Sequence, residues 1–451
     1  MGICDRPASI FNNRSATWTP NRPDAAFLHA LPKDSRATII SLSNRPIVVM
    51  HPPLTPQREN YLLLTLAGIQ LIDILDFMIM MPLGPILMSS FGMSTNEFGL
   101  LVSSYSFSGA LSGLLASTFV DRFERKRVLL TIFVLFGLST LACGLSPSYP
   151  TLLAARGLAG VFGGVIGAMV QTIVGDVIPF ERRARASGVI STAFSVSTVA
   201  GVPVSLWLAN HIGWRAPFFL IAALAVLFTI IGLKTLPDLR QHISTSRRVH
   251  PFAEMFAVMR DVNHLRALLL SALIIFSGFT VIPYITLYAV RNVGISQHDI
   301  PFVYLAGGAA TLITARRIGH WADLHGKVKV YRLVATVALL PLFAVTQIGS
   351  APLWMWLTLT TAFFVLVSGR MIPAMAIINS AAQPKLRGTF MSLNATIQSF
   401  AMGVATTLAG FAITQNSTGQ IIGYATAGYI AMTANVLAIL FVSRIVMHDQ
   451  K

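Results

Sequence analysis

Long apolar runs recur through most of this chain, and each is about as long as a helix that crosses a membrane. Such a helix needs about 20 mainly apolar residues to span roughly 30 Å of hydrocarbon. Hydrophobic residues make up 54% of the 451 residues and charged residues 11%, whereas soluble domains average about 25% charged residues. The runs lie near residues 61–85, 96–120, 128–146, 151–174, 186–210, 216–236, 268–289, 301–318, 331–348, 353–378, 390–413 and 421–442. The sequence therefore predicts an all-α membrane protein with twelve transmembrane helices.

The positive charge of the chain, +16 in net terms, lies mainly in alternate loops. Basic residues follow the second, fourth, sixth, eighth and tenth runs: Arg122, Arg125, Lys126 and Arg127; Arg182, Arg183 and Arg185; Arg240, Arg247, Arg248, Arg260 and Arg266; Arg316, Arg317, Lys327 and Lys329; Lys385 and Arg387. The intervening loops carry Arg215 and Arg291. By the positive-inside rule, the basic loops and both termini are cytoplasmic. The charge excess therefore indicates topology, with anionic membrane lipids as partners, and does not indicate nucleic-acid binding.

The sequence gives little support to redox, metal or nucleotide chemistry. Its two cysteines, Cys4 and Cys143, lie in the N-terminal tail and in the third run, so neither a disulfide framework nor a cysteine-based metal site is expected. The histidines lie mostly in tails or loops and lack the spacing of metal ligands. No Gly-x-x-x-x-Gly-Lys-Ser/Thr segment is present. We therefore expect no cofactor, no enzymatic activity and no ATP-driven pumping.

The distribution of polar segments divides the chain into two halves. Residues 1–56 are polar and rich in Pro, Asn, Arg and Ser, which predicts a disordered cytoplasmic tail. An alternative is that translation starts at Met50, so that this tail is largely absent. The remaining segments are an N-terminal six-helix bundle at 57–236, a cytoplasmic linker at 237–266, a C-terminal six-helix bundle at 267–444 and a short cytoplasmic tail at 445–451.

Two charged turns, at residues 117–127 and 319–327, share an unusual pattern. Each follows one apolar run and precedes another. A second pair of similar segments, Pro-Phe-Glu-Arg at 179–182 and Pro-Lys-Leu-Arg at 384–387, follows the charged turns at nearly equal distances. Two separate signals in one register indicate an internal duplication, and parallel repeats of this kind occur in transporters.

The charged turn has the form Gly-x-x-x-Asp-x-x-Gly-Lys/Arg, which resembles motif A of the major facilitator superfamily. The second copy fits at each defined position: Gly319, Asp323, Gly326 and Lys327. The first copy keeps Asp121, Arg122, Arg125 and Lys126, but has Ser117 and Glu124 where the family usually has glycine. The resemblance covers residues 61–444 and implies two pseudo-symmetric six-helix bundles around a central binding site. It also implies a gating role for these residues, in which each aspartate accepts hydrogen bonds from a partner helix and the bases bridge the halves or contact lipid phosphates.

Two acidic residues, Asp73 and Asp76, interrupt the first run. They are three residues apart, so they share one helix face, and they fall near the membrane midplane. A charged side chain there costs about 2.5–3.5 kcal/mol on insertion scales, which makes these acids functional candidates. Two neighbouring acids in a low dielectric favour proton uptake by at least one of them. We expect Asp76 to be the proton carrier, with Asp73 as the second candidate; a structural ion pair with a buried arginine is the alternative.

Two arginines within the runs are candidates for charge pairing or substrate contact. Arg156 begins an Arg-Gly-Leu-Ala-Gly segment that looks like motif B of the family, and we expect it to pair with a carboxylate of the first run. The alternative is a helix-end arginine that extends to the membrane surface. Arg370 lies deeper in the tenth run, where it either contacts a substrate anion or holds the C-terminal half together.

The fifth run contains Gly201 and Pro203 in a segment similar to motif C, which accompanies antiport in this superfamily. The match is partial, because Val202 separates the two residues and the final glycines of the family pattern are absent. The segment favours export, and a bend for helix packing is expected in either case. Polar residues that could line a central cavity are Gln70, Gln171, Asn379, Asn394 and Gln398.

Together these features predict a secondary active transporter in the plasma membrane. Residues 75–82 and 368–373 most resemble the bacterial branch of drug:proton antiporters and sugar efflux permeases. That resemblance implies the bacterial inner membrane. We expect a monomer that exports a small organic molecule by alternating access, driven by the proton gradient. Three alternatives remain: a proton symporter that imports a sugar or organic acid, a facilitative uniporter, and a membrane scaffold or sensor. The substrate itself is not indicated, because a fold does not determine its ligand.

Overall fold

The computed structural model describes residues 55–119, 123–237 and 251–448, all of which belong to one compact unit, Leu54–Lys451. The predicted N-terminal tail, the alternative start at Met50 and the last residues of the C-terminal tail lie outside the described residues. So do Asp121 and Arg122 of the first charged turn.

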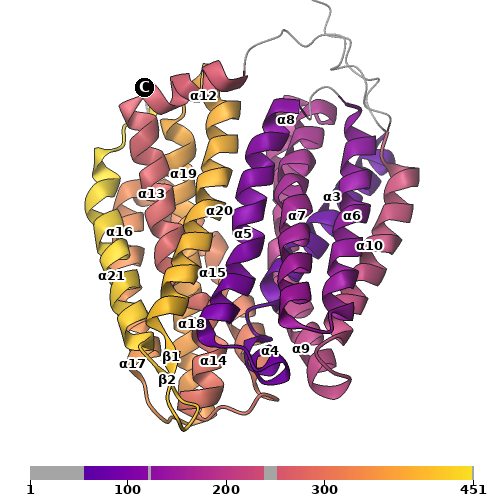
Figure 1. Ribbon diagram of the computed structural model, residues 1–451. Helices are drawn as coiled ribbons and strands as arrows, with labels where there is room; N and C mark the ends of the chain where they lie inside the picture. The colour runs from indigo at the N-terminus through magenta and orange to yellow at the C-terminus, as the bar shows by residue number, and fades with distance from the viewer. Residues whose placement is uncertain (1–54, 120–122, 238–250, 449–451) are drawn as a thin grey trace, which may run out of the picture. The chain divides into compact units, whose positions relative to one another are not determined.

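The N-terminal half is built from helices that alternate in direction (Figure 1). Their bounds are α3 Pro56–Ile79, α4 Gly84–Phe91, α5 Thr95–Phe119, α6 Arg125–Leu145, α7 Tyr149–Val177, α8 Phe180–Val196, the π-helical turn η2 Ser197–Gly201, α9 Val202–His211 and α10 Ala216–Thr235. Helix α7 begins with a capping box in which Ser148 and Thr151 satisfy each other's backbone amides. The first predicted span breaks before α4, where Pro82 and Gly84 stand in the sequence.

The C-terminal half repeats this arrangement with more interruptions. Its elements are α12 Pro251–Arg260, α13 Val262–Phe279, η3 Ile282–Tyr284, α14 Ile285–Tyr288, η4 Ala289–Val293, α15 Ile300–His325, α16 Lys327–Val337, α17 Leu339–Gln347, α18 Leu353–Gly369, α19 Met371–Ala381, η5 Pro384–Leu386, α20 Arg387–Ala412, β1 Thr414–Gln415, β2 Ile421–Ile422, α21 Tyr424–Phe441 and η6 Val442–Arg444. The two short strands pair antiparallel, with Thr414 opposite Ile422. Helix α13 begins several residues before the predicted seventh span, because Asp261 caps it by accepting hydrogen bonds from two backbone amides of its first turn.

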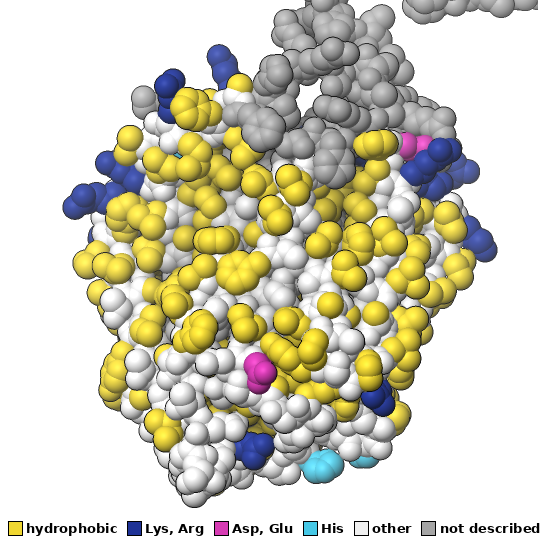
Figure 2. Space-filling model, viewed as in Figure 1, with side chains coloured by type: hydrophobic (Ala, Val, Ile, Leu, Met, Phe, Trp, Pro, Cys, Tyr) yellow, Lys and Arg dark blue, Asp and Glu magenta, His cyan; other side chains and the backbone are white. Residues whose placement is uncertain are grey.

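Eleven helical segments of the described chain are long and apolar enough to cross a membrane. The remaining predicted span, the eighth at 301–318, falls on α15, a helix of 26 residues. Large apolar side chains such as Leu111, Leu340 and Phe411 are exposed on the helix surfaces, and the space-filling view shows apolar side chains over the middle of the molecule (Figure 2). Lys and Arg side chains gather at the upper edge of that view, which we call the basic end; the opposite edge is called the far end. A lipid environment explains exposed apolar surface of this extent.

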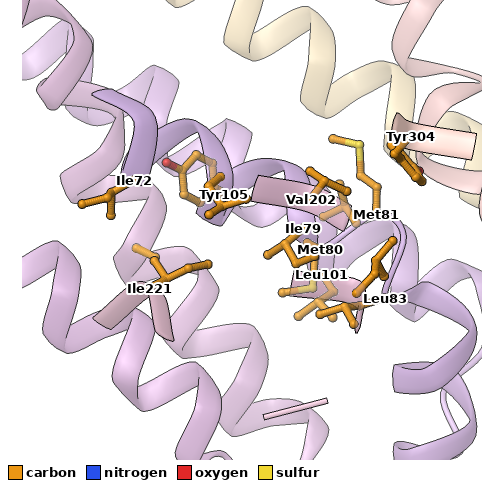
Figure 3. Close-up of a cluster of buried hydrophobic side chains, with 14 of the residues drawn as sticks. Ile72, Ile79, Met80, Met81, Leu83, Leu101, Tyr105, Val202, Ile221 and Tyr304 are labelled. Carbon is orange, nitrogen blue, oxygen red and sulfur yellow. The ribbon is translucent and has the colours of Figure 1, made fainter. Parts of the chain in front are cut away.

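Buried apolar side chains form one cluster that runs through both halves and a second cluster within the C-terminal half. Around α3, the side chains of Ile72, Ile79 and Leu101 belong to one continuous cluster (Figure 3). The two halves meet along α5 and α20, which lie side by side in the centre of Figure 1. They also meet where α9 and η2 pack against α15. The structure therefore has two helical bundles with a shared seam, which is where a central site must lie.

Candidate functional site

A cavity of about 720 Å³ lies at the seam between the two halves. Helices α3, α5 and α7 of the N-terminal half and α20 of the C-terminal half supply its walls. The lining residues are Asp73, Ile74, Phe77, Tyr105, Ser106, Gly109, Gly163, Gly164, Gly167, Ala168, Gln171, Thr172, Gly388, Met391, Ser392, Ala395, Ser399 and Met402. Asp73 is the one charged residue in this set. A small-molecule site of this size, mainly apolar with a few polar groups, is the usual form of a ligand pocket.

Asp73 lies on α3 with only 8% of its surface exposed. Tyr105 on α5 donates its hydroxyl hydrogen to one carboxylate oxygen at 2.8 Å. Gln70, one turn earlier on α3, donates to the other oxygen at 3.2 Å. Both donors are neutral, so neither cancels the charge of an ionised carboxylate. Asp73 is thus positioned and hydrogen-bonded, and it faces a cavity large enough for a ligand.

Asp76 has a different environment, although it lies one turn from Asp73 on the same helix. Arg156 on α7 donates to its carboxylate at 2.6 Å, and Thr140 on α6 donates to the other carboxylate oxygen at 3.0 Å. The side chains of Asp76 and Arg156 are both 0% exposed. Arg156 also lies over the ring of Tyr105, 4.7 Å from its centre. The sequence left two positions open for Arg156: a pair with a carboxylate of the first span, or a helix end at the membrane surface. The structure places it in a buried ion pair with Asp76 of that span.

Glycines on α7 allow the carboxylate and its tyrosine to meet. A Cβ atom added at Gly163 would lie 2.0 Å from the Tyr105 hydroxyl and 2.8 Å from the Asp73 carboxylate. One added at Gly164 would lie 2.4 Å from the backbone oxygen of Gly109 on α5. Real Cβ atoms do not approach this closely, so α5 and α7 can cross at this distance only with glycine at the contact. The glycine at position 163 thus makes room for the Asp73–Tyr105 hydrogen bond.

Arg370 lies at the break between α18 and α19 and does not line the cavity. It is buried and donates to the Asn435 side chain on α21, to the Ser277 hydroxyl at 3.2 Å and to the Ile274 carbonyl at 3.3 Å on α13. These contacts tie three helices of one half together. They fit the second of the two roles that the sequence left open, in which Arg370 holds the C-terminal half together.

Of the polar residues considered from the sequence, Gln171 lines the cavity and Gln70 reaches it through Asp73. Gln398 instead donates to the Ser271 hydroxyl at 2.8 Å, and Asn394 is buried. Tyr105 was not singled out from the sequence. Its signal is weak, because aromatic residues are common in apolar spans and only the helix crossing places this one beside an acid.

Comparison with known proteins identifies the fold. A family model described as Major Facilitator Superfamily matches residues 66–406. The chain belongs to this superfamily. It is similar to the MFS-type transporter YceJ of Bacillus subtilis, with 26% identity over 344 residues that cover 74% of this chain and 85% of YceJ. It is also similar to a probable sugar efflux transporter of Mannheimia succiniciproducens, with 22% identity over 354 residues, 78% of this chain and 85% of the relative.

Among solved structures, the D-xylose-proton symporter superposes with a TM-score of 0.71 at 17% identity, over 87% of this chain and 98% of that one. At this identity the likeness supports the fold alone. The sequence prediction of the superfamily and of its helical fold is confirmed. The protein is therefore a multi-pass membrane transporter of the secondary type and not an enzyme.

The two motif A turns of this superfamily member differ in their contacts. In the first, Arg125 pairs with Asp176 near the end of α7, and Arg127 pairs with Glu124 at 2.9 Å. Lys126, next to Arg125, is half-buried.

In the second turn, Gly319 and Asp323 lie on α15, Gly326 ends that helix and Lys327 begins α16. Gly326 has a φ of 93°, a left-handed conformation that favours glycine and explains its place in the motif. Asp323 is exposed. In this motif Lys327 occupies the position of Arg125, and within residues 55–119, 123–237 and 251–448 it forms no ion pair like the one between Arg125 and Asp176.

The motif C segment coincides with the π-helical turn η2 and the start of α9. A Cβ atom at Gly201 would lie 2.8 Å from Leu75, so this glycine permits close approach to α3. Ser197 donates to the Leu71 carbonyl at 3.0 Å. Pro203 stands in the first turn of α9, where the helical segment changes from π to α. The segment is thus a π-helical turn packed against the helix that carries Asp73.

Proposed function

We propose that this protein exports a small organic cation in exchange for protons, using the proton gradient as its energy source. The observation that carries the proposal is the single carboxylate of the cavity, Asp73, whose recorded hydrogen bonds come from neutral groups. A carboxylate without a cationic partner in a water-poor site gains most from binding either a proton or a positively charged ligand. Competition between the two for one group is sufficient to couple their movements.

The geometry supports a different assignment of the two acids from the one expected from the sequence. Arg156 already neutralises Asp76, and an arginine keeps its charge at any working pH. We therefore assign proton and substrate binding to Asp73, and assign a structural role to the Asp76–Arg156 pair.

The walls of the cavity suit an amphipathic cation. Phe77 and Tyr105 present aromatic rings and Met391 and Met402 present flexible thioethers, all of which contact apolar or cationic groups favourably. We propose that the basic end is cytoplasmic, in a bacterial inner membrane, and that a single chain is the working unit.

The polar contacts recorded between the halves support an inward-facing state. Thr95 donates to the Ile413 carbonyl, Arg291 donates to the Ser89 hydroxyl at 3.2 Å, and Asn210 donates to the Gln297 carbonyl at 3.1 Å. All three join residues at the far end. With the basic end cytoplasmic, such contacts close the outer side, and alternating access then requires them to break.

Sugar transport is the second candidate, because one relative is named as a probable sugar efflux transporter and one structural neighbour as a D-xylose-proton symporter. The groups of the cavity that could form hydrogen bonds with a sugar are the side chains of Ser106, Gln171, Thr172, Ser392 and Ser399.

The test is substrate-induced proton movement in proteoliposomes that contain a pH-sensitive dye. Lipophilic cations, D-xylose and neutral amino acids are each presented to the intact protein and to Asp73→Asn and Asp73→Glu. We expect cations to induce proton counterflow in the intact protein. This counterflow should be lost in Asp73→Asn and retained in Asp73→Glu. Proton movement with D-xylose and none with cations would favour the sugar candidate. Unchanged proton counterflow in Asp73→Asn would overturn the assignment of the carrier, and transport without proton movement would overturn coupling itself.

A further inference from the structure

Two exposed histidines face each other across the seam at the far end of the molecule. His211 ends α9 of the N-terminal half, and His298 lies just before α15 of the C-terminal half. Their ring centres are 6.0 Å apart and their planes are inclined by 75°. The transport cycle proposed above makes no use of either side chain. Two imidazoles on different halves of a transporter are the kind of pair that one metal ion could join.

The ring of His211 is held in an orientation suited to metal binding. Its Nδ1 atom lies 2.8 Å from the carbonyl oxygen of Trp207, one turn earlier on α9. This hydrogen bond places the proton on Nδ1 and leaves the lone pair of Nε2 available. The Trp207 ring stacks on the imidazole, with centres 4.6 Å apart and planes inclined by 28°. Metal-binding histidines are commonly fixed through the opposite ring nitrogen in this way.

The distance between the rings fits a shared ion. With metal–nitrogen bonds of about 2.0 Å, two imidazoles on one ion have ring centres roughly 5–6 Å apart. The backbone around the pair is also fixed, because Asn210 donates to the Gln297 carbonyl at 3.1 Å. These residues immediately precede His211 and His298, so the hydrogen bond holds the two segments together without using either imidazole.

We propose that His211 and His298 bind a divalent ion that prefers imidazole nitrogen, such as Zn²⁺ or Cu²⁺, and that the bound ion joins the two halves at the far end. Within the described residues no group of three or more His, Cys, Asp and Glu side chains is placed to hold a metal. The ion therefore takes two ligands from the protein and completes its coordination with water. A site of this kind is open and exchangeable, which suits regulation by ambient metal more than a permanent structural role.

The ion is expected to favour the conformation described here. If the halves separate at the far end during transport, the two histidines separate too, and the ion keeps one of its two protein ligands. A ligand that binds one conformation more tightly shifts the population toward it. Metal ions at the far end should therefore slow turnover, whatever the substrate is.

The first test measures binding without transport. The full chain is purified with an affinity tag that contains no histidine and is loaded with one equivalent of Cu²⁺. Pulsed electron paramagnetic resonance then counts the imidazoles on the ion through their remote nitrogens. We expect two in the intact protein and one in His211→Ala and in His298→Ala. His325→Ala is the matched control, because His325 also bonds the carbonyl of a tryptophan one turn earlier, Trp321, but lies within a single half.

The second test measures the effect on transport. Zn²⁺ is added to the outer face of cells or oriented vesicles, with and without EDTA. We expect inhibition that EDTA reverses, and a shift of the half-inhibitory Zn²⁺ concentration by at least about tenfold in either histidine variant, with no shift in His325→Ala. A copper signal from one imidazole in the intact protein would overturn the shared site. A two-imidazole signal that survives both single substitutions would overturn it as well. Two imidazoles with no inhibition would overturn the conformational effect.

Discussion

The buried pair of Asp76 and Arg156 offers the sharpest test of the energetics of this fold. Replacing Arg156 with methionine removes the donor at 2.6 Å from the carboxylate and leaves Asp76, which is 0% exposed, with the Thr140 hydroxyl as its remaining side-chain donor. Breaking a buried ion pair from one side typically costs about 3–5 kcal/mol. We expect a loss of that size in the free energy of unfolding of Arg156→Met.

The reverse substitution, Asp76→Leu, should cost a similar amount at neutral pH, but the two losses should respond differently to acid. The carboxyl left by Arg156→Met can take up a proton and become neutral, so its loss shrinks as the pH falls. The guanidinium left by Asp76→Leu stays charged, so its loss does not shrink. The double variant exchanges the pair for apolar side chains of similar size and should recover most of the stability.

The assay is unfolding of the purified protein in detergent micelles by increasing amounts of dodecyl sulfate, followed by intrinsic tryptophan fluorescence at pH 7.5 and pH 5. The four proteins form a double-mutant cycle, whose interaction energy measures the coupling of the two side chains. An interaction energy near zero, with the double variant as unstable as the sum of the single ones, would refute the reasoning. So would a loss for Arg156→Met that is independent of pH.

Three further substitutions, the first with a matched control, test packing, gating and capping. Gly164→Ala should lower the thermal unfolding midpoint by several degrees, since its Cβ would lie 2.4 Å from the Gly109 carbonyl oxygen, whereas Gly157→Ala, with nothing within 4 Å, should be neutral or stabilising. Gly410→Leu would place a Cβ 3.3 Å from the Thr95 carbonyl oxygen and 3.4 Å from the Cα atom of Gly99, both on α5 of the other half, so we expect faster labelling of a cysteine introduced at the far end. Asp261→Ala removes the cap of α13 and should cost about 1 kcal/mol. Desolvation opposes ionisation of this side chain, yet hydrogen bonds from backbone amides hold the pKa of Asp261 below its ordinary value. The ionised Asp261 therefore stabilises the folded state at pH values above the pKa of an aspartate in the unfolded chain. This stabilisation is lost as the pH falls below about 4, and acid unfolding curves measure the loss.

Equal midpoints for the two alanine variants would mean that the helix crossing relaxes at little cost. Labelling of Gly410→Leu at the wild-type rate would mean that this contact does not hold the far end closed. A difference between the wild type and Asp261→Ala that persists unchanged in acid would mean that the carboxylate is not the stabilising group.

Much of the fold could be predicted from the sequence because the length and hydrophobicity of a segment are enough to identify a membrane helix. The positions of the helix ends are harder to predict. The apolar pattern begins near residue 268, but the cap supplied by Asp261 starts α13 at Val262. The break before α4 coincides with Pro82 and Gly84, but the π-helical turn at η2 packs against other helices, and no local pattern contains that packing.

The sequence singled out the two acids and Arg156, but neither Tyr105 nor the pairing of Arg156 with Asp76. Asp73 and Asp76 stand out in the sequence as acids in an apolar run, and Arg156 as a partner for one of them. The sequence does not say which one, because that depends on how α3 is rotated relative to α7. The same rotation brings Tyr105 to Asp73, and the absence of a side chain at Gly163 makes the contact possible.

A cavity with one negative charge also limits the thermodynamics of exchange. If Asp73 exchanges one proton for one monovalent cation, as we propose, the cycle moves no net charge across the membrane. Such an exchange is electroneutral, and the membrane potential cannot drive it. Only the difference in proton concentration does, and each pH unit is worth about 1.4 kcal/mol. The steepest cation gradient that such a transporter could sustain is therefore about tenfold per pH unit, however tightly the cavity binds its cargo.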